Sequence, residues 1–338
     1  MPRSRITIRD VANHAGVSHQ TVSRVINNSE RVRPETRTCV EAAIKELGYR
    51  PNAIARSMAR GHTCTLACIS PNLTDYTFAN IIEGAEAEVR KHGYFLVTSS
   101  APTEEDFSRL IEELFTSSRA EGLLVINPYA DNRHKLLPSE APTIFISQHR
   151  EQETVGSVAL DDLNAARKAT QHLIDLNHKR IALVTGPMEE DCSQDRCAGY
   201  KEALQENGIT FDPALTITGD WTATSGYLAL QKLLTGAIIP SAIFAQNDRM
   251  AIGVLRAARE NGIPVPEELS VIGIDDMPLS SYFDPPLTTM RQDTLSIGRE
   301  AARLLIDTLE KREMSPKQIL LQAQLVKRES TGLLSTTT

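Results

Sequence analysis

From residue 66 onward, short apolar runs alternate with longer amphipathic stretches, and no other feature constrains the fold as strongly. The runs predicted as strands are 66–70, 94–98, 122–126, 143–147, 181–185, 215–218, 242–245, 271–274 and 287–291. The main stretches predicted as helices are 79–92, 105–118, 164–177, 195–207, 223–235, 249–261 and 295–312. Repeated strand–helix units form parallel sheets covered by helices. So many strands exceed what one such sheet usually carries. We therefore expect two α/β lobes with a boundary near residue 160.

The first fifty residues predict an all-α head of three short helices. Thr7 is placed to cap the first helix, and Gly16 ends it. Ser18 is placed to cap the second helix after a short turn. The third begins at Pro34, a residue suited to the first position of a helix.

Charge divides the chain in the same place. Residues 1–62 hold 11 Lys and Arg against 5 acids, a net charge of +6, whereas the whole chain carries −7. The remaining residues are therefore strongly acidic. A small basic head on a large acidic body indicates two functions in one chain, with nucleic acid as the partner of the head.

The second helix, within VSHQTVSRVINN, has one apolar side formed by Val22, Val25 and Ile26. The turn before it predicts a helix-turn-helix, whose second helix enters the major groove of DNA. His19 and Gln20 are placed to contact base edges, since a Gln amide suits the N6 and N7 atoms of adenine. The alternative is an ordinary solvated helix face. The candidate DNA-binding residues of the head are Thr7, Ser18, His19, Gln20, Thr21, Ser23, Arg24 and Asn27.

The head also resembles a known family. TIRDVANHAGVSHQTVSRVINN, followed by RPETRTCVEAAIKELGYRPNAIARSMARG, is similar to the DNA-binding head of the lactose-repressor (LacI/GalR) family of bacterial transcription regulators. The resemblance implies a head over residues 1–50 and a hinge helix over 51–62 that forms on DNA. In the family, paired hinge helices insert apolar side chains into the minor groove at the centre of a near-palindromic operator. It implies DNA contacts for Asn52, Ala55 and Met58.

Met58 departs from the Leu that is usual in the family, which leaves the affinity of the hinge open. A buried contact in the dimer is the alternative role for Met58.

The acidic body resembles the core of the same family, which is similar to periplasmic sugar-binding proteins. The resemblance implies an effector-binding core over residues 63–335. Its first lobe comprises 63–160 and 292–320, and its second lobe 161–291 and 321–335. A small-molecule effector, expected to be a saccharide, binds between the lobes and controls DNA affinity. The effector-binding candidates are Phe78, Ser147, Glu190, Cys192, Arg196, Trp221, Asn247, Asp275 and Gln292.

Trp221 and Arg196 have chemistry suited to a sugar. An indole can stack on the apolar face of a sugar ring, and a guanidinium can bind vicinal oxygens or a carboxylate. The alternatives are packing of a helix N-terminus by Trp221 and an ion pair of Arg196 with a nearby acid.

Asn247 and Asp275 lie at predicted strand ends, where ligands of α/β proteins bind. Three further residues also have a structural alternative. Asp248 is as well placed to cap the next helix as to face the cleft, Asp275 can form a local turn, and Phe78 can belong to the helix core.

Glu190 and Cys192 replace the Ser, Thr or Arg that relatives often carry. A carboxylate at the cleft disfavours anionic effectors, so a neutral saccharide is expected.

Other functions find little support in the sequence. The segment MPRSRITIRD lacks the apolar region of a signal peptide, which argues against a solute-binding protein for uptake. No apolar run approaches the length of a membrane span. The five cysteines show no CxxC spacing, so we expect reduced thiols in a bacterial cytoplasmic, nucleoid-associated protein without metal or cofactor. No nucleophile elbow, P-loop or dinucleotide motif indicates an enzyme. No leucine heptad follows the core, which favours a homodimer over a tetramer.

Overall fold

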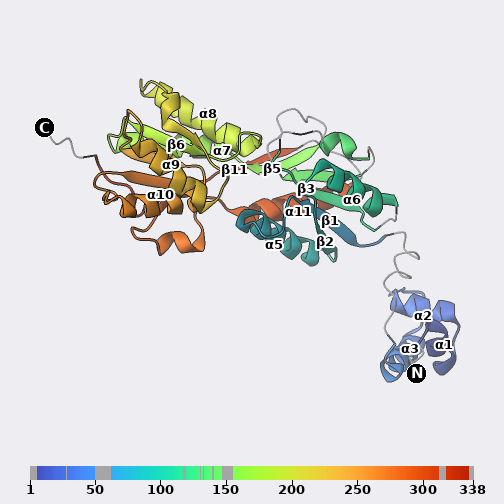
Figure 1. The fold of residues 1–338 in the computed structure, drawn as a ribbon. Helices are drawn as coiled ribbons and strands as arrows, with labels where there is room; N and C mark the ends of the chain where they lie inside the picture. The colour runs from blue at the N-terminus through green and yellow to red at the C-terminus, as the bar shows by residue number, and fades with distance from the viewer. Residues whose placement is uncertain are drawn as a thin grey trace, which may run out of the picture. The chain divides into compact units, whose positions relative to one another are not determined.

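The computed structural model describes residues 6–27, 29–49, 62–116, 119–129, 131, 133–138, 141–146, 155–311 and 317–334. The chain forms two compact units, Met1–Cys64 and Thr65–Thr338 (Figure 1). The hinge candidates Asn52, Ala55 and Met58 and the cleft candidate Ser147 lie outside the described residues.

The described residues of the first unit form three helices. They are α1 Ile8–His14, α2 His19–Ile26 and α3 Pro34–Leu47. Val22 and Val25 of α2 pack with Val11 of α1 and Val40 of α3, and all four side chains are buried. Ile26 lies partly buried beside them. The prediction of a three-helix head with one apolar side on α2 is therefore confirmed.

Local hydrogen bonds set the boundaries of α1 and α2. The Asp10 carboxylate accepts hydrogen bonds from both the amide and the hydroxyl of Thr7, each at 2.7 Å. The Ser18 hydroxyl accepts a hydrogen bond from the Thr21 amide at 3.1 Å. Gly16, in the turn between the helices, has a φ of 65°, which glycine adopts without a steric penalty. These caps fix a short turn that presents α2 as the second helix of a helix-turn-helix.

Two six-stranded sheets form the second unit, in the orders β11-β5-β4-β3-β1-β2 and β12-β10-β9-β8-β6-β7. The strands of the first sheet are β1 Thr65–Ser70, β2 Phe95–Ser100, β3 Gly122–Ile126, β4 Thr143–Ile146, β5 Gly156–Leu160 and β11 Gln318–Leu321. Those of the second are β6 Ile181–Thr185, β7 Thr216–Thr218, β8 Ala242–Ala245, β9 Ser270–Asp275, β10 Thr288–Arg291 and β12 Gln324–Val326. All neighbours are parallel except β10 and β12. The predicted two-lobed α/β core is confirmed.

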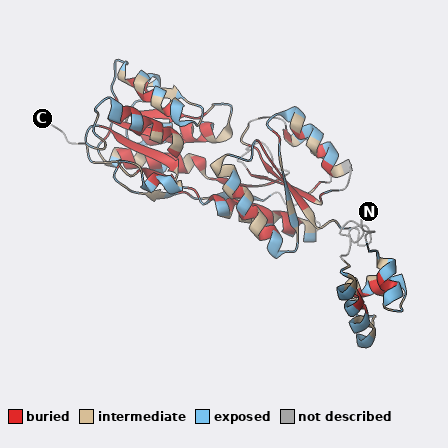
Figure 2. Ribbon diagram, turned by 60° about the horizontal axis from the view of Figure 1, so that its bottom comes forward, coloured by how far each residue is buried: buried red, intermediate tan, exposed pale blue. Residues whose placement is uncertain are grey.

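Helices cover the sheets. Those of the first lobe are α5 Tyr76–Lys91, α6 Glu104–Thr116 and α11 Thr294–Lys311. Those of the second lobe are α7 Asp162–Asp175, α8 Asp191–Glu206, α9 Ala223–Leu234 and α10 Asp248–Glu260. Short 3-10 turns lie at η1 Arg133–Leu136, η2 Pro213–Leu215 and η3 Pro278–Ser281. Figure 2 shows buried strands between helices whose outer faces are exposed. This burial on both faces explains the continuous apolar runs in the sequence.

Three strands were missed by the sequence analysis. β5 is rich in small residues, and β11 and β12 are short and begin with Gln. Each is held by a partner far away in the sequence, β11 by β5 and β12 by β10. Such non-local pairing leaves little trace in local periodicity.

The chain passes between the sheets three times. The passages lie between β5 and α7, between β10 and α11, and between β11 and β12. Leu321 ends β11 in the first sheet, so the last passage follows residue 321 rather than 320. These three segments connect the lobes.

Candidate functional site

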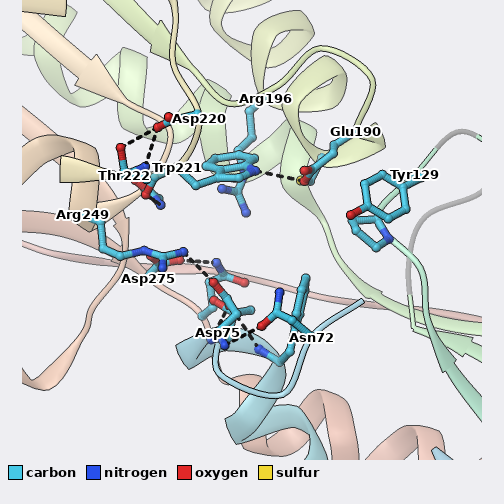
Figure 3. A pocket seen from close by; sticks show the side chains of 16 residues that line it. Asn72, Asp75, Tyr129, Glu190, Arg196, Asp220, Trp221, Thr222, Arg249 and Asp275 are labelled. Atoms are coloured by element: carbon cyan, nitrogen blue, oxygen red, sulfur yellow. Dashed lines mark hydrogen bonds and ion pairs between the residues drawn. The ribbon is translucent and has the colours of Figure 1, made fainter. Parts of the chain in front are cut away.

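A cavity of about 280 Å³ lies between the lobes of the second unit (Figure 3). Its lining residues follow the carboxyl ends of strands in both sheets. Asn72 and Asp75 come after β1, Tyr129 after β3, and Trp221 after β7, and Asp275 ends β9. The position agrees with the rule that α/β sheets bind ligands beyond their carboxyl ends.

Eight of the nine sequence-predicted effector residues line this cavity. They are Phe78, Glu190, Cys192, Arg196, Trp221, Asn247, Asp275 and Gln292, and the ninth, Ser147, lies outside the described residues. The residues that sequence analysis missed are Asn72, Asp75, Thr77, Pro128, Tyr129, Asp220, Thr222 and Arg249. Most are close sequence neighbours of a predicted residue. The strand-end rule, applied to β1 and β3, would have indicated the others.

The indole of Trp221 is fixed in position. Its backbone has a φ of 67°, an unusual conformation for a bulky residue. The indole Nε1 donates to the Glu190 carboxylate at 3.0 Å. The side-chain Nδ2 of Asn247 donates to the Trp221 carbonyl at 3.1 Å. The ring also lies against Gly186, where a Cβ would come within 2.1 Å of a ring carbon. The glycine thus makes room for the indole to lie against the backbone.

Arg196 is buried and already paired. Its Nε donates to Asp162 at 2.7 Å, and an Nη donates to the Gln246 carbonyl at 2.5 Å. The guanidinium carbon lies 5.7 Å from the centre of the Trp221 ring. The ion-pair alternative therefore holds for Arg196, although its partner lies 34 positions away at the start of α7. Arg196 therefore forms the ion pair with Asp162 and lines the cavity at the same time.

Two buried carboxyls meet at the end of β9. Asp248 accepts hydrogen bonds from Ser280 at 2.5 Å and Thr289 at 2.6 Å, and from the Met277 amide at 3.0 Å. Asp275 accepts from Gln292 at 2.7 Å and only distantly, at 3.4 Å, from the Asp248 amide. The carboxyl of Asp248 is thus the better stabilised as an anion.

Burial, together with the neighbouring Asp248, raises the pKa of Asp275 to about 8. Burial also raises the pKa of Asp248, to about 6. Asp275 is consequently the group that retains its proton near neutral pH.

The alternative in which Asp248 caps α10 is wrong. Asn247 is the cap, because its side-chain oxygen accepts from the Met250 amide at 2.8 Å. Asp248 instead points into the lobe, toward η3 and β10.

Two further contacts join the lobes beside the cavity. Arg249 of α10 donates to Asp75 at 2.6 Å, and the other oxygen of Asp75 caps α5. On another part of the rim, Tyr129 and Glu190 form an isolated β-bridge, and the Asp191 amide donates to the Pro128 carbonyl at 3.0 Å. The cavity is thus closed by contacts that an opening motion would have to break.

The cavity wall carries more acid than base. Carboxyls of Asp75, Glu190, Asp220 and Asp275 line it, whereas both of its arginines are ion-paired, Arg196 with Asp162 and Arg249 with Asp75. Burial raises the pKa of Glu190, so its anionic form is disfavoured there. No unpaired cation among the described lining residues is available to an anionic ligand. The wall offers hydrogen bonds to a neutral one.

A smaller cavity of about 110 Å³ adjoins the first and shares Phe78, Pro128 and Arg196 with it. Its remaining wall is mainly aliphatic and includes Ile81, Ile126, Ile146, Leu160 and Ile297. Phe78 therefore both lines the cavities and packs against the core. The structure thus gives Phe78 both positions that the sequence suggested, in the cavity wall and against the helix core.

The candidate DNA-binding residues follow the outer side of the head. Thr7, Ser18, His19, Gln20 and Arg24 are exposed, and Thr21, Ser23 and Asn27 are partly exposed. The Ser18 and Thr21 hydroxyls bond to each other at 2.9 Å at the start of α2. His19, Gln20 and Arg24 are exposed on α2, whereas its Val22 and Val25 are buried.

Comparison with known proteins places this geometry in a family. Residues 7–52 match the model of bacterial regulatory proteins of the lacI family, and residues 170–331 match the periplasmic binding protein-like domain. The chain is 34% identical to the HTH-type transcriptional repressor CytR of Escherichia coli K12, over 97% of each chain. The chain belongs to the lacI family.

Other members show how far the likeness extends. The lacI-family regulator CelR of Thermobifida fusca is 36% identical, over 97% of this chain and 99% of its own. A solved CelR–cellobiose complex aligns with 96% of this chain at 34% identity and a TM-score of 0.75. The lac repressor dimer, solved with operator and the anti-inducer ONPF, aligns with 97% at 31% identity and a TM-score of 0.90.

These lacI-family relatives are named as transcriptional regulators rather than enzymes. In the described part of the chain, no helix is both long and apolar enough to cross a membrane.

Asp275→Asn should stabilise the protein at alkaline pH in the absence of ligand. The raised pKa of Asp275 means that its contribution to stability is complete below about pH 4 and is lost as the pH rises through 8. Asn does not titrate, so the melting temperature of the variant should exceed that of the wild type by about 3 °C or more at pH 8.5.

The Asp275→Asn difference should shrink toward pH 5. His172 and His178, whose pKa values are lowered by burial, change stability in the opposite direction, but equally in both proteins. Scanning calorimetry from pH 5 to 8.5 measures the difference, and a difference independent of pH would contradict the protonated state of Asp275.

Gly186→Ala should displace the indole of Trp221, because the new methyl group would overlap the ring. Trp221 is the only tryptophan, so intrinsic fluorescence reports on this cavity alone. We expect emission shifted to longer wavelength as the ring leaves the wall. Gly236→Ala, at the end of α9 and with no atom closer than 3.2 Å, is the control. Unchanged emission in Gly186→Ala would show that the indole is not held against this backbone.

Proposed function

We propose that this lacI-family regulator binds a near-palindromic operator as a homodimer and that a neutral saccharide between its lobes controls its affinity. One observation carries the proposal: a helix-turn-helix and a two-lobed core share one chain, and the core cavity combines an indole with convergent hydrogen-bonding groups. The domain roles follow, with the head over residues 1–50, a hinge over 51–62 and the effector core over 63–335.

DNA recognition is assigned to α2. His19 and Gln20 lie in its first turn, where recognition helices contact base edges, and Arg24 lies one turn further on the exposed side. The remaining polar residues of the head, with Asn52, Ala55 and Met58 of the hinge, are proposed to contact phosphates and the minor groove. The basic charge of residues 1–62 supports this partner.

A saccharide suits the wall chemistry. Trp221 supplies a rigid apolar surface, while Asn247, Asp275 and Gln292 supply donors and acceptors for hydroxyl groups. The paired arginines and the surrounding carboxyls disfavour sugar acids and sugar phosphates, which would bring charge to a wall without a free cation. The cellobiose bound by CelR supports the same ligand class.

Dimerisation has a physical basis in exposed apolar side chains. Phe95, on the edge strand β2, is 75% exposed, and Tyr282, after η3, is 83% exposed. Val97 and Leu279 are exposed beside them in sequence. Apolar side chains that are this exposed become association surfaces where they gather into a patch, and Phe95 and Val97 share one edge strand. The lac repressor dimer on its operator supports the same state here.

The competing functions are less well supported. A solute-binding protein for uptake would not need the basic helix-turn-helix head. For an enzyme, the lining thiol of Cys192 lies 3.9 Å from the Glu190 carboxylate, but burial raises the pKa of this thiol, which disfavours the thiolate needed for nucleophilic attack. We infer a regulator that acts on DNA in the bacterial cytoplasm and does not turn over its ligand.

Phe95→Asp should shift the protein from dimer to monomer, because a charge replaces an apolar contact. Leu228→Asp is the matched control, since Leu228 is 58% exposed on α9 in the second lobe. Sedimentation velocity at micromolar concentration measures the shift. Equal behaviour of both variants would refute this surface as the dimer contact.

His19→Ala and Gln20→Ala should each lower affinity for the selected operator about 10- to 100-fold and leave affinity for random DNA nearly unchanged. Arg24→Ala, as a phosphate contact, should weaken both and reduce the salt dependence by about one ion. The operator is first selected from a random DNA pool, and affinities are then measured by titration at several salt concentrations. Equal losses on operator and random DNA would remove the base-contacting role of α2.

The decisive experiment tests whether a ligand in the core cavity changes DNA binding by the head. A thermal-shift screen of neutral mono- and disaccharides, sugar acids and sugar phosphates identifies native-state ligands. A neutral saccharide should raise the melting temperature and change mobility in a gel shift with the selected operator. Trp221→Ala should abolish the thermal shift and retain DNA binding. Stabilisation by a sugar phosphate alone would exclude the neutral class, and consumption of the sugar at enzyme rates would exclude the regulator-only function.

A further inference from the structure

The residue after the cavity carboxyl Asp275 has an unusual environment. Asp275 and Asp276 have φ values of 136° and 57°, and they are the only consecutive non-glycine residues of positive φ in the described chain. Such conformations cost free energy and persist only where the surroundings hold them. Asp276 is not among the lining residues of the cavity, and its side chain is 7% exposed. It is therefore held by contacts within the fold.

Two arginines provide those contacts. The Nε of Arg291 lies 2.6 Å from one oxygen of Asp276, and an Nη of Arg328 lies 2.5 Å from the other. Arg328 also donates to the Leu287 carbonyl at 2.7 Å, and the Asp276 amide donates to the Thr289 hydroxyl at 3.3 Å. Each carboxylate oxygen thus has its own guanidinium, which defines the orientation of the side chain.

Arg291 stands beside one of the three segments that connect the lobes, and Arg328 lies beyond β12, the strand that the last of these segments enters. Arg291 is the last residue of β10, directly before the chain passes to α11. Arg328 follows β12, soon after the final passage. Gln292, next to Arg291, donates to the Asp275 carboxyl at 2.7 Å, and its amide donates to the Asp275 carbonyl at 3.3 Å. Asp275 therefore contacts Gln292, and Asp276 contacts Arg291, so both carboxyls bind the start of the same connecting segment.

We propose that Asp276 is a positioning residue which, through Arg291 and Arg328, holds the Asp275 carboxyl in the cavity and ties it to the segments connecting the lobes. The proposal deepens the proposed function and rests on it, because it gives the route by which a ligand on Asp275 changes the angle between the lobes. A force on Asp275 passes to Asp276 and, by its two ion pairs, to β10 and the segment after β12.

The charged and titratable groups around Asp275 define a test that needs no ligand. Asp248 of α10, Arg196 of α8 and Tyr76 of α5 act on it electrostatically, and Asp276 adjoins it. Burial beside Asp248 keeps Asp275 protonated. If the ion pairs of Asp276 with Arg291 and Arg328 are removed, the Asp275 carboxyl should reach solvent, and its pKa should fall toward the ordinary value for Asp. A structural ion pair without a positioning role would instead lower stability equally at every pH.

Asp276→Ala and Asp276→Asn separate charge from conformation. Asn tolerates positive φ and retains an acceptor oxygen, whereas Ala provides neither. We expect Asp276→Ala to remove more than half of the pH-dependent difference in melting temperature that Asp275→Asn defines between pH 5 and 8.5. Asp276→Asn should remove less, and it remains informative if the Ala variant does not fold.

Glu88→Gln is the matched control. Glu88 is a 5% exposed carboxylate paired with Lys91, His92 and Arg303 in the first lobe, and the comparison is made in a His92→Gln background so that none of its partners titrates between pH 5 and 8.5. Hydrogen bonding to Lys91 lowers its pKa, so its contribution to stability is lost only in acid and is constant from pH 5 to 8.5. The control should lower the melting temperature by one amount across this range. The same uniform loss in Asp276→Ala would overturn the positioning role.

Hydrogen exchange tests the connection to the lobes. Asp275→Asn should change amide exchange in 288–292 and 324–328 at least twofold in the wild-type background and by a smaller factor in the Asp276→Asn background. An equal change in both backgrounds would show that Asp276 does not carry the effect. Neither DNA nor saccharide enters this experiment. Its failure would therefore leave the proposed regulator function intact, and failure of the saccharide screen would leave this result intact.

Discussion

The site depends on two buried carboxyls that meet at the end of β9. Asp248 is stabilised by hydroxyl and amide donors, so the neighbouring Asp275 is left to hold its proton or meet a ligand. This arrangement costs stability as the pH rises, and a ligand hydroxyl that donates to Asp275 would offset that cost. Under the proposed function, the acidic cavity suits a neutral partner with donors, and the empty protein is the less stable for it.

The other charged groups around the cavity also have partners within the protein. Arg196 and Arg249 are neutralised by Asp162 and Asp75 before any ligand arrives, and Glu190 is engaged with the indole of Trp221. Specificity then rests on shape and hydrogen bonding rather than on ion pairing. Because the Asp75 and Glu190 contacts also join the lobes, the wall that binds a ligand is the wall that holds the lobes together. Ligand binding and lobe closure share the same groups.

Much of this was predictable, for a local reason. The head follows from caps and turns only a few residues apart, such as Thr7 with Asp10 and Ser18 with Thr21. Eight cavity residues were predicted because strand ends and family motifs mark them in the sequence. Sequence analysis missed β11 and β12, whose partners are distant, and its alternative of Asp248 as the cap of α10 was wrong. Tyr129 of a loop and Arg249 of α10 were missed because they reach the cavity only when two lobes face each other.

The sequence by itself determined the class of each part: a basic helix-turn-helix head, an α/β core and the aromatic and polar residues available to a ligand. These depend on periodicity, capping and charge, which act over a few residues. Only the tertiary structure decided which groups are free. It paired Arg196 with an aspartate 34 positions away, buried Asp248 beside Asp275, and joined Asp276 to Arg291 and Arg328. Ion pairing and desolvation depend on distances in space, which residues far apart in the chain reach only in the folded state.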